Sequence, residues 1–409
     1  MNPVTYLSKC ESELSSHFAR IDSMADRRLM GVVEAYRKVG LTNSDLCGST
    51  GYGLGDPSRD KLEEVYSMVF GGESALVRPQ IASGTHALAC VLFGLSRPGD
   101  RIVSITGTPY ETLQEVIGIR QSVGSLSEFG VSYAQTDWRA DGPKDFDLLV
   151  PPTKIIMIQR SPGYKTGRPV MVDSIREWVE VIRKAGSGAA IMVDNCYCEF
   201  CSEKEPCHAG ADLSVGSLIK NPGGGLAFTG GYIVGKSNLV SRIATRVTAP
   251  GIGAEVGATW GFMLDAFRGL FAAPPLSSSA LKGSLLWAKC FASLGFEVNP
   301  KHNEEHADVV VSIKLDSREL FMAFGKAIQE VSPIASGATP VPFDQGGYDA
   351  PVMLAGGGFI SGGTSDLSCD GLDKPPYWVY VQGGANMNHI RLGILNVLSS
   401  FERMGFFGA

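Results

Sequence analysis

Residues 217–225 read SLIKNPGGG and place Lys220 between a short apolar run and a loop that holds Pro222 and three glycines. Proline and glycine interrupt regular structure, so the stretch predicts a strand that ends just before the lysine. An amine that reacts with a bound carbonyl group needs a fixed backbone and open space, which the glycines can supply, and burial can make it nucleophilic. A solvated loop lysine is the alternative, and the local sequence alone favours it.

Upstream of Lys220, short apolar runs alternate with segments of helical pattern. This β–α alternation predicts an α/β fold with a mostly parallel central sheet covered by helices. The predicted strands are 75–82, 101–106, 154–160 and 189–195, and the predicted helices between them are 85–95, 110–120 and 175–185.

The remaining segments suggest three parts. Apolar residues at helical spacing predict an N-terminal helical arm within residues 1–50, with Gly40 as a helix stop. Residues 51–275 form the expected large α/β domain and residues 276–409 a smaller C-terminal α+β domain. FAAPPLSSS, residues 271–279, is the expected hinge, with one helix before it (255–271) and another after it (280–296).

Composition excludes several classes of function. The 409 residues carry a net charge of −6 and no basic block, which argues against nucleic acid or an anionic membrane as a partner. There is no apolar run long enough for a transmembrane helix and no secretory signal pattern at the N-terminus. Nine cysteines in such a chain suggest reduced thiols and a cytoplasmic location.

An acid follows a second apolar run, IMVDNCY at residues 191–197. Ligands of parallel α/β sheets bind at the carboxyl ends of the strands, where Asp194 is expected to lie. A buried carboxylate there needs a cationic partner, and a protonated pyridine nitrogen is one such partner. A helix cap or a structural ion pair is the alternative.

Two further stretches suit a flat, phosphorylated cofactor. Ser83, Gly84 and Thr85 lie at a strand-to-helix turn, where free N–H groups attract an anion. Tyr110 lies at another such junction and could stack on a heterocycle. Each feature alone also fits an ordinary turn or a core tyrosine. The order of turn, aromatic residue, strand-end acid and lysine indicates a pyridoxal 5'-phosphate (PLP) site.

Four stretches carry a resemblance to a known family: RPQIASGTHA (78–87), VDNCYCEF (193–200), SLIKNPGGG (217–225) and TAPGIGAEVG (248–257). They resemble the methionine gamma-lyase-related proteins, often labelled aluminium-resistance proteins, which are close to the cystathionine lyases. The resemblance covers nearly the whole chain. It implies the aspartate-aminotransferase-like fold of PLP fold type I.

The resemblance also implies roles for individual residues. Lys220 would hold PLP as a Schiff base, Asp194 would pair with the pyridine nitrogen, and Tyr110 would stack on the ring. The turn at Ser83, Gly84 and Thr85 would bind the phosphate with the hydroxyl of Ser217. Tyr52 would reach the phosphate bound by a neighbouring subunit, which implies a homodimer or homotetramer with active sites at the dimer interface.

Three residues are candidates for binding the substrate carboxylate: Lys374, which stands where the family usually has arginine, Arg391 and Arg160. The family usually also has glycine in place of Cys198 and proline in place of Phe228. A lysine would offer a point charge where arginine offers a planar fork.

The run CYCEFCSEKEPCH contains four cysteines and a histidine. A zinc site is one interpretation of Cys196, Cys198, Cys201, Cys207 and His208. The spacing lacks paired C-x2-C knuckles, so unrelated thiols and no metal are the favoured interpretation.

The resemblance favours a lyase that cleaves the C–S bond of a sulfur-containing amino acid, as cystathionine beta-lyases and methionine gamma-lyases do. Lys220 would act as the general base at Cα, and Tyr52 or Tyr110 would protonate the leaving sulfur. An aldolase, a racemase or a transaminase is an alternative, because the expected contacts serve the cofactor and do not select the reaction. A PLP-binding protein with a non-catalytic role in metal resistance is another.

Overall fold

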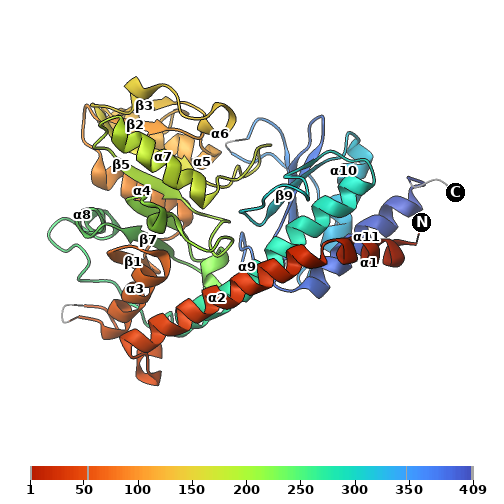
Figure 1. Cartoon of the computed structure of the whole chain (residues 1–409), viewed down its shortest axis with the longest axis horizontal. Helices are drawn as coiled ribbons and strands as arrows, with labels where there is room; N and C mark the ends of the chain where they lie inside the picture. The colour runs from red at the N-terminus through yellow and green to blue at the C-terminus, as the bar shows by residue number, and fades with distance from the viewer. Residues whose placement is uncertain (1, 53–54, 347, 407–409) are drawn as a thin grey trace.

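A seven-stranded sheet with the order β1-β7-β6-β5-β4-β2-β3 forms the core of the larger part of the computed structural model (Figure 1). The structure describes residues 2–52, 55–346 and 348–406. Strand β7 runs antiparallel to β1 and β6, and the other neighbouring strands are parallel. The predicted α/β architecture is therefore confirmed. The strands are β1 Ser74–Arg78, β2 Arg101–Ser104, β3 Ser132–Gln135, β4 Thr153–Gln159, β5 Ala190–Asp194, β6 Leu213–Ser217 and β7 Gly231–Gly235.

Helices cover both faces of this sheet because consecutive strand residues are apolar and point to opposite faces. In β5, Met192 packs into the core beneath α4, α5 and α8, whereas Ile191 and Val193 pack into the core beneath α7. Within α7, buried Ile175, Trp178 and Ile182 recur at helical spacing. The helices of this unit are α3 Pro57–Phe70, α4 Gly84–Leu95, α5 Glu111–Ile117, α6 Trp138–Asp141, α7 Val172–Lys184 and α8 Ser237–Val247.

A second, antiparallel sheet with the order β10-β11-β12-β9-β8 lies in the C-terminal part. Its core joins the C-terminal half of α9 with α10 and α11. The elements are α9 Met263–Ser293, β8 Val298–Asn299, β9 Val310–Lys314, α10 Arg318–Glu330, β10 Val352–Ala355, β11 Ser368–Leu372, β12 Trp378–Gln382 and α11 Met387–Arg403.

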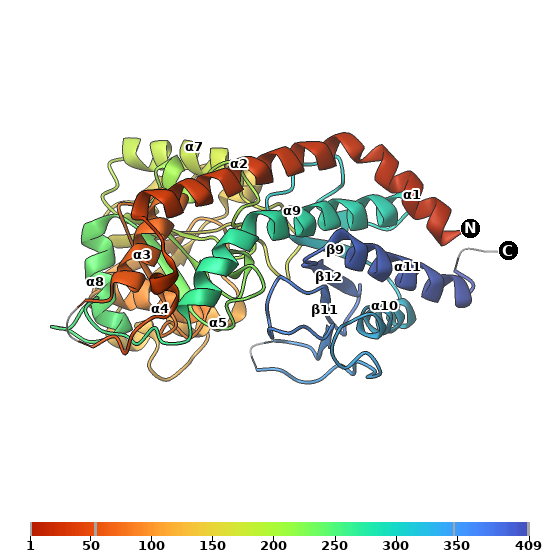
Figure 2. The same cartoon turned by 90° about the horizontal axis from the view of Figure 1, so that it is seen from below.

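The expected hinge at residues 271–279 is wrong, because helix α9 runs through it without a break. Pro274, Pro275 and the three serines after them favour a loop locally. Most residues of α9 are buried, however, so tertiary packing overrides the local preference. Figure 2 shows this helix running from the large sheet to the C-terminal sheet. The proposed boundary at 275/276 therefore falls inside a helix.

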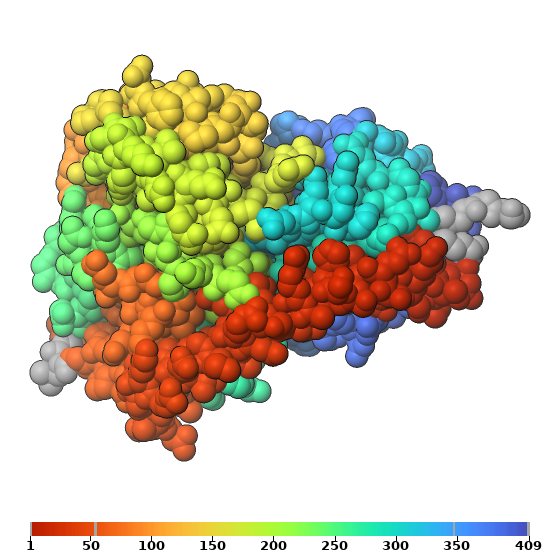
Figure 3. Space-filling model, viewed as in Figure 1, coloured from red at the N-terminus to blue at the C-terminus, as the bar shows by residue number. Residues whose placement is uncertain are grey.

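The N-terminal arm consists of α1 Pro3–Glu13 and α2 Ser15–Val39. Gly40 ends α2 in the left-handed conformation that glycine tolerates, as the sequence predicts. Helix α2 lies along α9, and the arm extends over both parts of the chain (Figures 2 and 3). Within the described ranges, no helix is both long and apolar enough to cross a membrane.

Candidate active site

Lys220 lies three residues after the end of β6, at the start of the short turn Asn221–Gly223. Its Nζ donates hydrogen bonds to the hydroxyl of Tyr197 at 2.8 Å and to the carbonyl of Gly362 at 2.5 Å. The side chain is half-buried. Burial lowers the pKa of Lys220, but neighbouring groups, Tyr197 first, shift that pKa above its ordinary value overall. In the absence of a cofactor, the amine is therefore held as an ammonium group.

The glycines after Lys220 were expected to leave open space in front of the amine. Instead, they allow the loop to pack closely against helix α9. A Cβ on Gly224 would lie 2.1 Å from the carbonyl oxygen of Gly269 in α9, and Gly224 has a φ of +56°. Only glycine permits both features without strain. The close approach fixes the backbone that carries the lysine.

Asp194 is the last residue of β5, between the ends of β4 and β6. It is 6% exposed, and Oδ1 accepts the N–H of Cys196 at 3.1 Å. Burial raises the pKa of the Asp194 carboxyl to about 6, while the charge of Lys220 acts in the opposite direction. Among the described residues, none forms an ion pair with Asp194, so this buried acid suits a cationic ligand group.

The start of α4 forms a concave turn beside β6. Ser83 caps the helix by accepting the N–H of His86, and Gly84 and Thr85 open its first turn. A Cβ on Gly84 would lie 3.3 Å from both the Sγ of Cys196 and the Cβ of Ser217, so the strand ends approach this turn closely. The first N–H groups of a helix have no partner within the helix. These residues therefore fit a phosphate group.

Tyr110 precedes α5 and lies beside the same turn. Its hydroxyl is 3.0 Å from the Oγ1 of Thr85. Burial raises the pKa of Tyr110 well above its ordinary value, and the charge of Asp194 adds to this increase. The structure therefore brings Thr85, Tyr110, Asp194, Ser217 and Lys220 to one end of the sheet.

Tyr52, by contrast, is 87% exposed and makes no contact with Lys220 in the described residues. The loop that carries it is tied to residues 248–259, because the N–H of Gly257 donates to the carbonyl of Gly51 at 2.9 Å. The Nε2 of Gln80 also donates a hydrogen bond to the carbonyl of Ala258, within residues 248–259. Tyr52 is therefore exposed at the surface, next to a residue that is hydrogen-bonded to the neighbouring loop.

The three candidates for the substrate carboxylate are all engaged by other protein groups. Arg160 is fully buried and donates to the Oδ1 of Asn195 at 2.7 Å. Lys374 pairs with Asp349 at 2.8 Å, and Arg391 pairs with Glu11 of helix α1. The structure gathers none of these side chains beside the amine of Lys220.

Three residues near Lys220 escaped the sequence analysis. The hydroxyl of Tyr197 accepts a hydrogen bond from the amine. Tyr197 follows Asp194 by three residues, so its closeness in sequence to that acid was a signal that could have identified it. Tyr164 donates a hydrogen bond to Asp370, and burial raises the pKa of that carboxyl to about 6 while the charge of Lys220 acts in the opposite direction. Tyr164 and Asp370 are 206 residues apart, so no local pattern links them.

Within the cysteine-rich run, Cys198 and Cys201 are buried, Cys196 and Cys207 are half-buried, and His208 is exposed. Cys196, Cys198, Cys201 and Cys207 are free thiols, and burial raises the pKa of each above its ordinary value. In the described part of the chain, no group of three or more histidine, cysteine or acidic residues is arranged to hold a metal ion.

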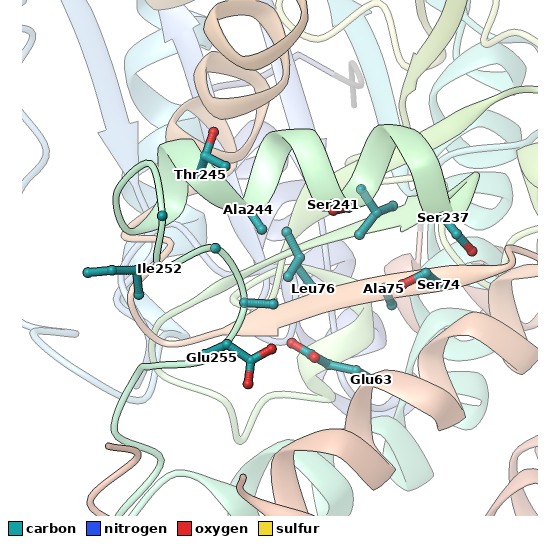
Figure 4. Close-up of a pocket in the computed structure, with 14 residues that line it drawn as sticks. Glu63, Ser74, Ala75, Leu76, Ser237, Ser241, Ala244, Thr245, Ile252 and Glu255 are labelled. Carbon is teal, nitrogen blue, oxygen red and sulfur yellow. The ribbon is translucent and has the colours of Figure 1, made fainter. Parts of the chain in front are cut away.

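A separate hollow of about 420 Å³ lies between β1, α8 and the loop at residues 251–255 (Figure 4). Glu63 and Glu255 face it from one side, and residues of α8 line the other side. Glu63 already pairs with Arg78 at 2.5 Å. None of the residues gathered around Lys220 lines this hollow.

A loop lysine, a buried strand-end acid, a helix-start phosphate turn and an aromatic residue together fit PLP, and with this sheet order they define a fold-type-I PLP-dependent enzyme. The methionine gamma-lyase family model matches residues 4–402, so the chain belongs to the methionine gamma-lyase family.

Similar proteins span most of the chain. YnbB of Bacillus subtilis (strain 168) is 43% identical over 396 residues, which cover 95% of this chain and 94% of YnbB. A carbon-sulfur lyase involved in aluminum resistance from Clostridium novyi NT is 38% identical, with a TM-score of 0.92 and coverage of 97% of this chain and 95% of that one. The L-methionine gamma-lyase of Pseudomonas putida is 31% identical over 46% of this chain and 44% of its own length.

Because Asp194 is buried, the free energy of unfolding of the protein without cofactor should depend on pH. The pKa of Asp194 is raised from 3.8 to about 6 on folding, so the folded chain holds this proton more tightly than the unfolded chain. Wild-type apo-protein should lose stability relative to Asp194→Asn as the pH rises from about 4 to about 6, by on the order of 3 kcal/mol. Urea unfolding of both proteins at several pH values measures this difference. A constant difference across that range would contradict the burial of an unpaired carboxyl.

Proposed function

We propose that this protein is a PLP-dependent lyase that cleaves the C–S bond of a sulfur-containing amino acid, releasing a thiol, a 2-oxo acid and ammonia. The observation that carries the proposal is that Asp194 ends β5, Lys220 follows the neighbouring strand β6, and the charge of the lysine acts on the buried carboxyl. Membership of the methionine gamma-lyase family supports the choice of reaction.

In this proposal each residue has one task toward the cofactor. Lys220 attaches it covalently, and Asp194 holds a proton on the pyridine nitrogen. Gly84, Thr85 and Ser217 bind the phosphate, and Tyr110 covers the ring. PLP bound in this way supplies an electron sink for the bond that breaks at Cα.

The chain's own residues then move the protons. Lys220, once released by the substrate amine, takes the proton from Cα. The C–S bond breaks, and the sulfur leaves as a thiol after it gains a proton from Tyr110 or from Tyr52 of a second subunit. One water molecule completes the balance by converting the remaining unsaturated amine to the 2-oxo acid and ammonia.

Product assays test this reaction directly. Holoenzyme incubated with L-cystathionine or L-methionine should release thiol, 2-oxo acid and ammonia in equal amounts. Lys220→Ala should lose the visible absorbance of the bound cofactor and at least 1,000-fold of the rate, because the covalent attachment and the base are removed together.

Lys204→Ala, which changes an exposed lysine, is the matched control and should retain both properties. Glycine formed from threonine, with no thiol from either thioether, would instead identify an aldolase. A visible cofactor band that survives in Lys220→Ala would show that another residue holds the cofactor.

We further propose that the active protein is a homodimer or a larger assembly of dimers in which Tyr52 completes the site of the neighbouring subunit. Two observations support this arrangement: Tyr52 is exposed, and the preceding residue, Gly51, is held by a hydrogen bond from Gly257. Trp260, Leu264 and Phe271 are also exposed and lie on or just before α9, close in sequence to the loop that anchors Tyr52. Such aromatic and aliphatic surface suits a subunit interface.

Mixed dimers test the shared site. Tyr52→Ala and Lys220→Ala proteins should each be inactive or nearly so alone. After the two variants are unfolded, mixed and refolded together, activity should recover to about a quarter of wild type, because half of the dimers are mixed and each carries one intact site. No recovery, with mixed dimers present, would place Tyr52 outside the partner's site.

A cytoplasmic location fits the same proposal. The nine cysteines are all free thiols, as expected in a reducing compartment.

A further inference from the structure

A hollow of about 340 Å³ lies at the edge of the large sheet opposite the candidate active site. It is formed where β4, β5 and β6 begin and where β7 leads into α8, since its lining includes Lys154, Ala190, Asp212 and Lys236. Ala190 begins the strand that Asp194 ends, so about 13 Å of β5 separate the hollow from the buried acid. None of its described lining residues is assigned to the cofactor.

Positive charge gathers around this hollow. Four cations line it, and they come from β4, the last turn of α7, the residue before α8 and α8 itself: Lys154, Arg183, Lys236 and Arg242. Asp212 is the single acid among the described lining residues. The lining of this basic hollow therefore carries a surplus of three positive charges, although the whole chain has a net charge of −6.

The carboxylate of Asp212 is already fully engaged. Its Oδ2 lies 2.5 Å from the Nη2 of Arg183 and accepts the N–H of Ile191 at 2.7 Å. Its Oδ1 pairs with the Nζ of Lys236 at 2.6 Å, and the side chain is 3% exposed. Asp212 thus holds two of the four cations in place, and it has no free oxygen for the other two.

The other two cations, Lys154 and Arg242, take part in no ion pair between described residues. The Nη2 of Arg242 reaches only the carbonyl of Leu95, at 3.5 Å. Both side chains belong to exposed residues at the rim of the basic hollow. They are therefore available to an anion that enters from solvent.

The acids on the adjoining elements do not supply that anion. The Oε2 of Glu73 accepts the N–H of Ser237 at the start of α8, at 3.0 Å. Glu180 of α7 pairs with Lys184 of the same helix at 3.8 Å. Neither Glu73 nor Glu180 lines the basic hollow. Its surplus charge is consequently left to solvent ions or to a ligand.

The wall beneath the cations is apolar. Leu95 and Ala189 are buried, and Ala190 and Leu239 are half-buried. A volume of about 340 Å³ falls within the range of sites that hold small organic molecules. The basic hollow therefore has room for an organic body as well as for an anionic group.

We propose that the basic hollow is a binding site for a small phosphate monoester, separate from the candidate active site. The phosphate would lie between Lys154 and Arg242, in front of the cations that hold Asp212, and the organic body would contact Leu95 and Leu239. A phosphate monoester carries nearly two negative charges at neutral pH and accepts charge-assisted hydrogen bonds from lysine and arginine. A monocarboxylate would balance only one of the three surplus charges. The proposal does not depend on the reaction catalysed at Lys220.

Calorimetric titration of the holoenzyme tests this site with three probes: inorganic phosphate, adenosine 5'-monophosphate and pyridoxine 5'-phosphate, which lacks the aldehyde needed to attach to Lys220. We expect at least one ester to bind once per chain with a Kd below about 1 mM in about 50 mM NaCl, and at least about five-fold more weakly in about 300 mM NaCl. That ester should bind about three-fold or more tightly than inorganic phosphate, because the apolar wall contacts its organic body. The visible absorbance of the bound cofactor should stay unchanged.

Charge reversal on α8 provides a matched pair of variants. Arg242→Glu changes a lining cation and should weaken ester binding at least about ten-fold. Arg246→Glu makes the same change one turn further along the helix, at an exposed residue outside the lining, and should alter the Kd by less than about two-fold. Lys154→Ala, which removes a second rim cation, should weaken binding about three-fold or more.

Three results would overturn the site. The first is no saturable binding of either ester to wild type. The second is an equal loss of binding in Arg242→Glu and Arg246→Glu, which would show that the esters respond only to overall charge. The third is equal binding of all three probes, which would remove the role of the apolar wall. Thiol release by the holoenzyme is a separate measurement, so failure of the proposed lyase function would leave this result intact.

Discussion

A carboxyl group buried at the end of β5 is the constraint on which the rest of the site depends. Asp194 lies between parallel strands, largely hidden from water and without an ion-pair partner among the described residues. Its charge is costly there unless a cationic ligand group arrives. The helix-start turn at Gly84 and the amine of Lys220 occupy the adjacent strand ends, so the same place offers an anion site, an acid and a nucleophile.

The two parts of the chain build this site together. The large sheet supplies the residues assigned to the cofactor, and helix α9 supports the lysine loop through the close contact between Gly224 and Gly269. The C-terminal sheet supplies Asp370, which meets Tyr164 of the large sheet.

Much of this arrangement could be predicted from the sequence because it is local. Strand ends, helix caps and the loop after β6 follow from residues close together in the chain. The continuous helix α9 could not be predicted, since burial of most of its residues outweighs the preference of Pro274 and Pro275 for a loop. Asp370 was missed for a related reason: its partners come from distant segments, and an isolated acid in a strand carries no local signal.

The most direct measurement is to reduce the holoprotein with borohydride, digest it and locate the cofactor by peptide mass spectrometry. Reduction fixes the bond between the cofactor and its lysine. The modification should be found on the peptide that contains Lys220 and on no other peptide. A cofactor attached to a different lysine, or a holoprotein with no covalently held cofactor, would contradict the assignment of this strand-end lysine and of the buried acid opposite it.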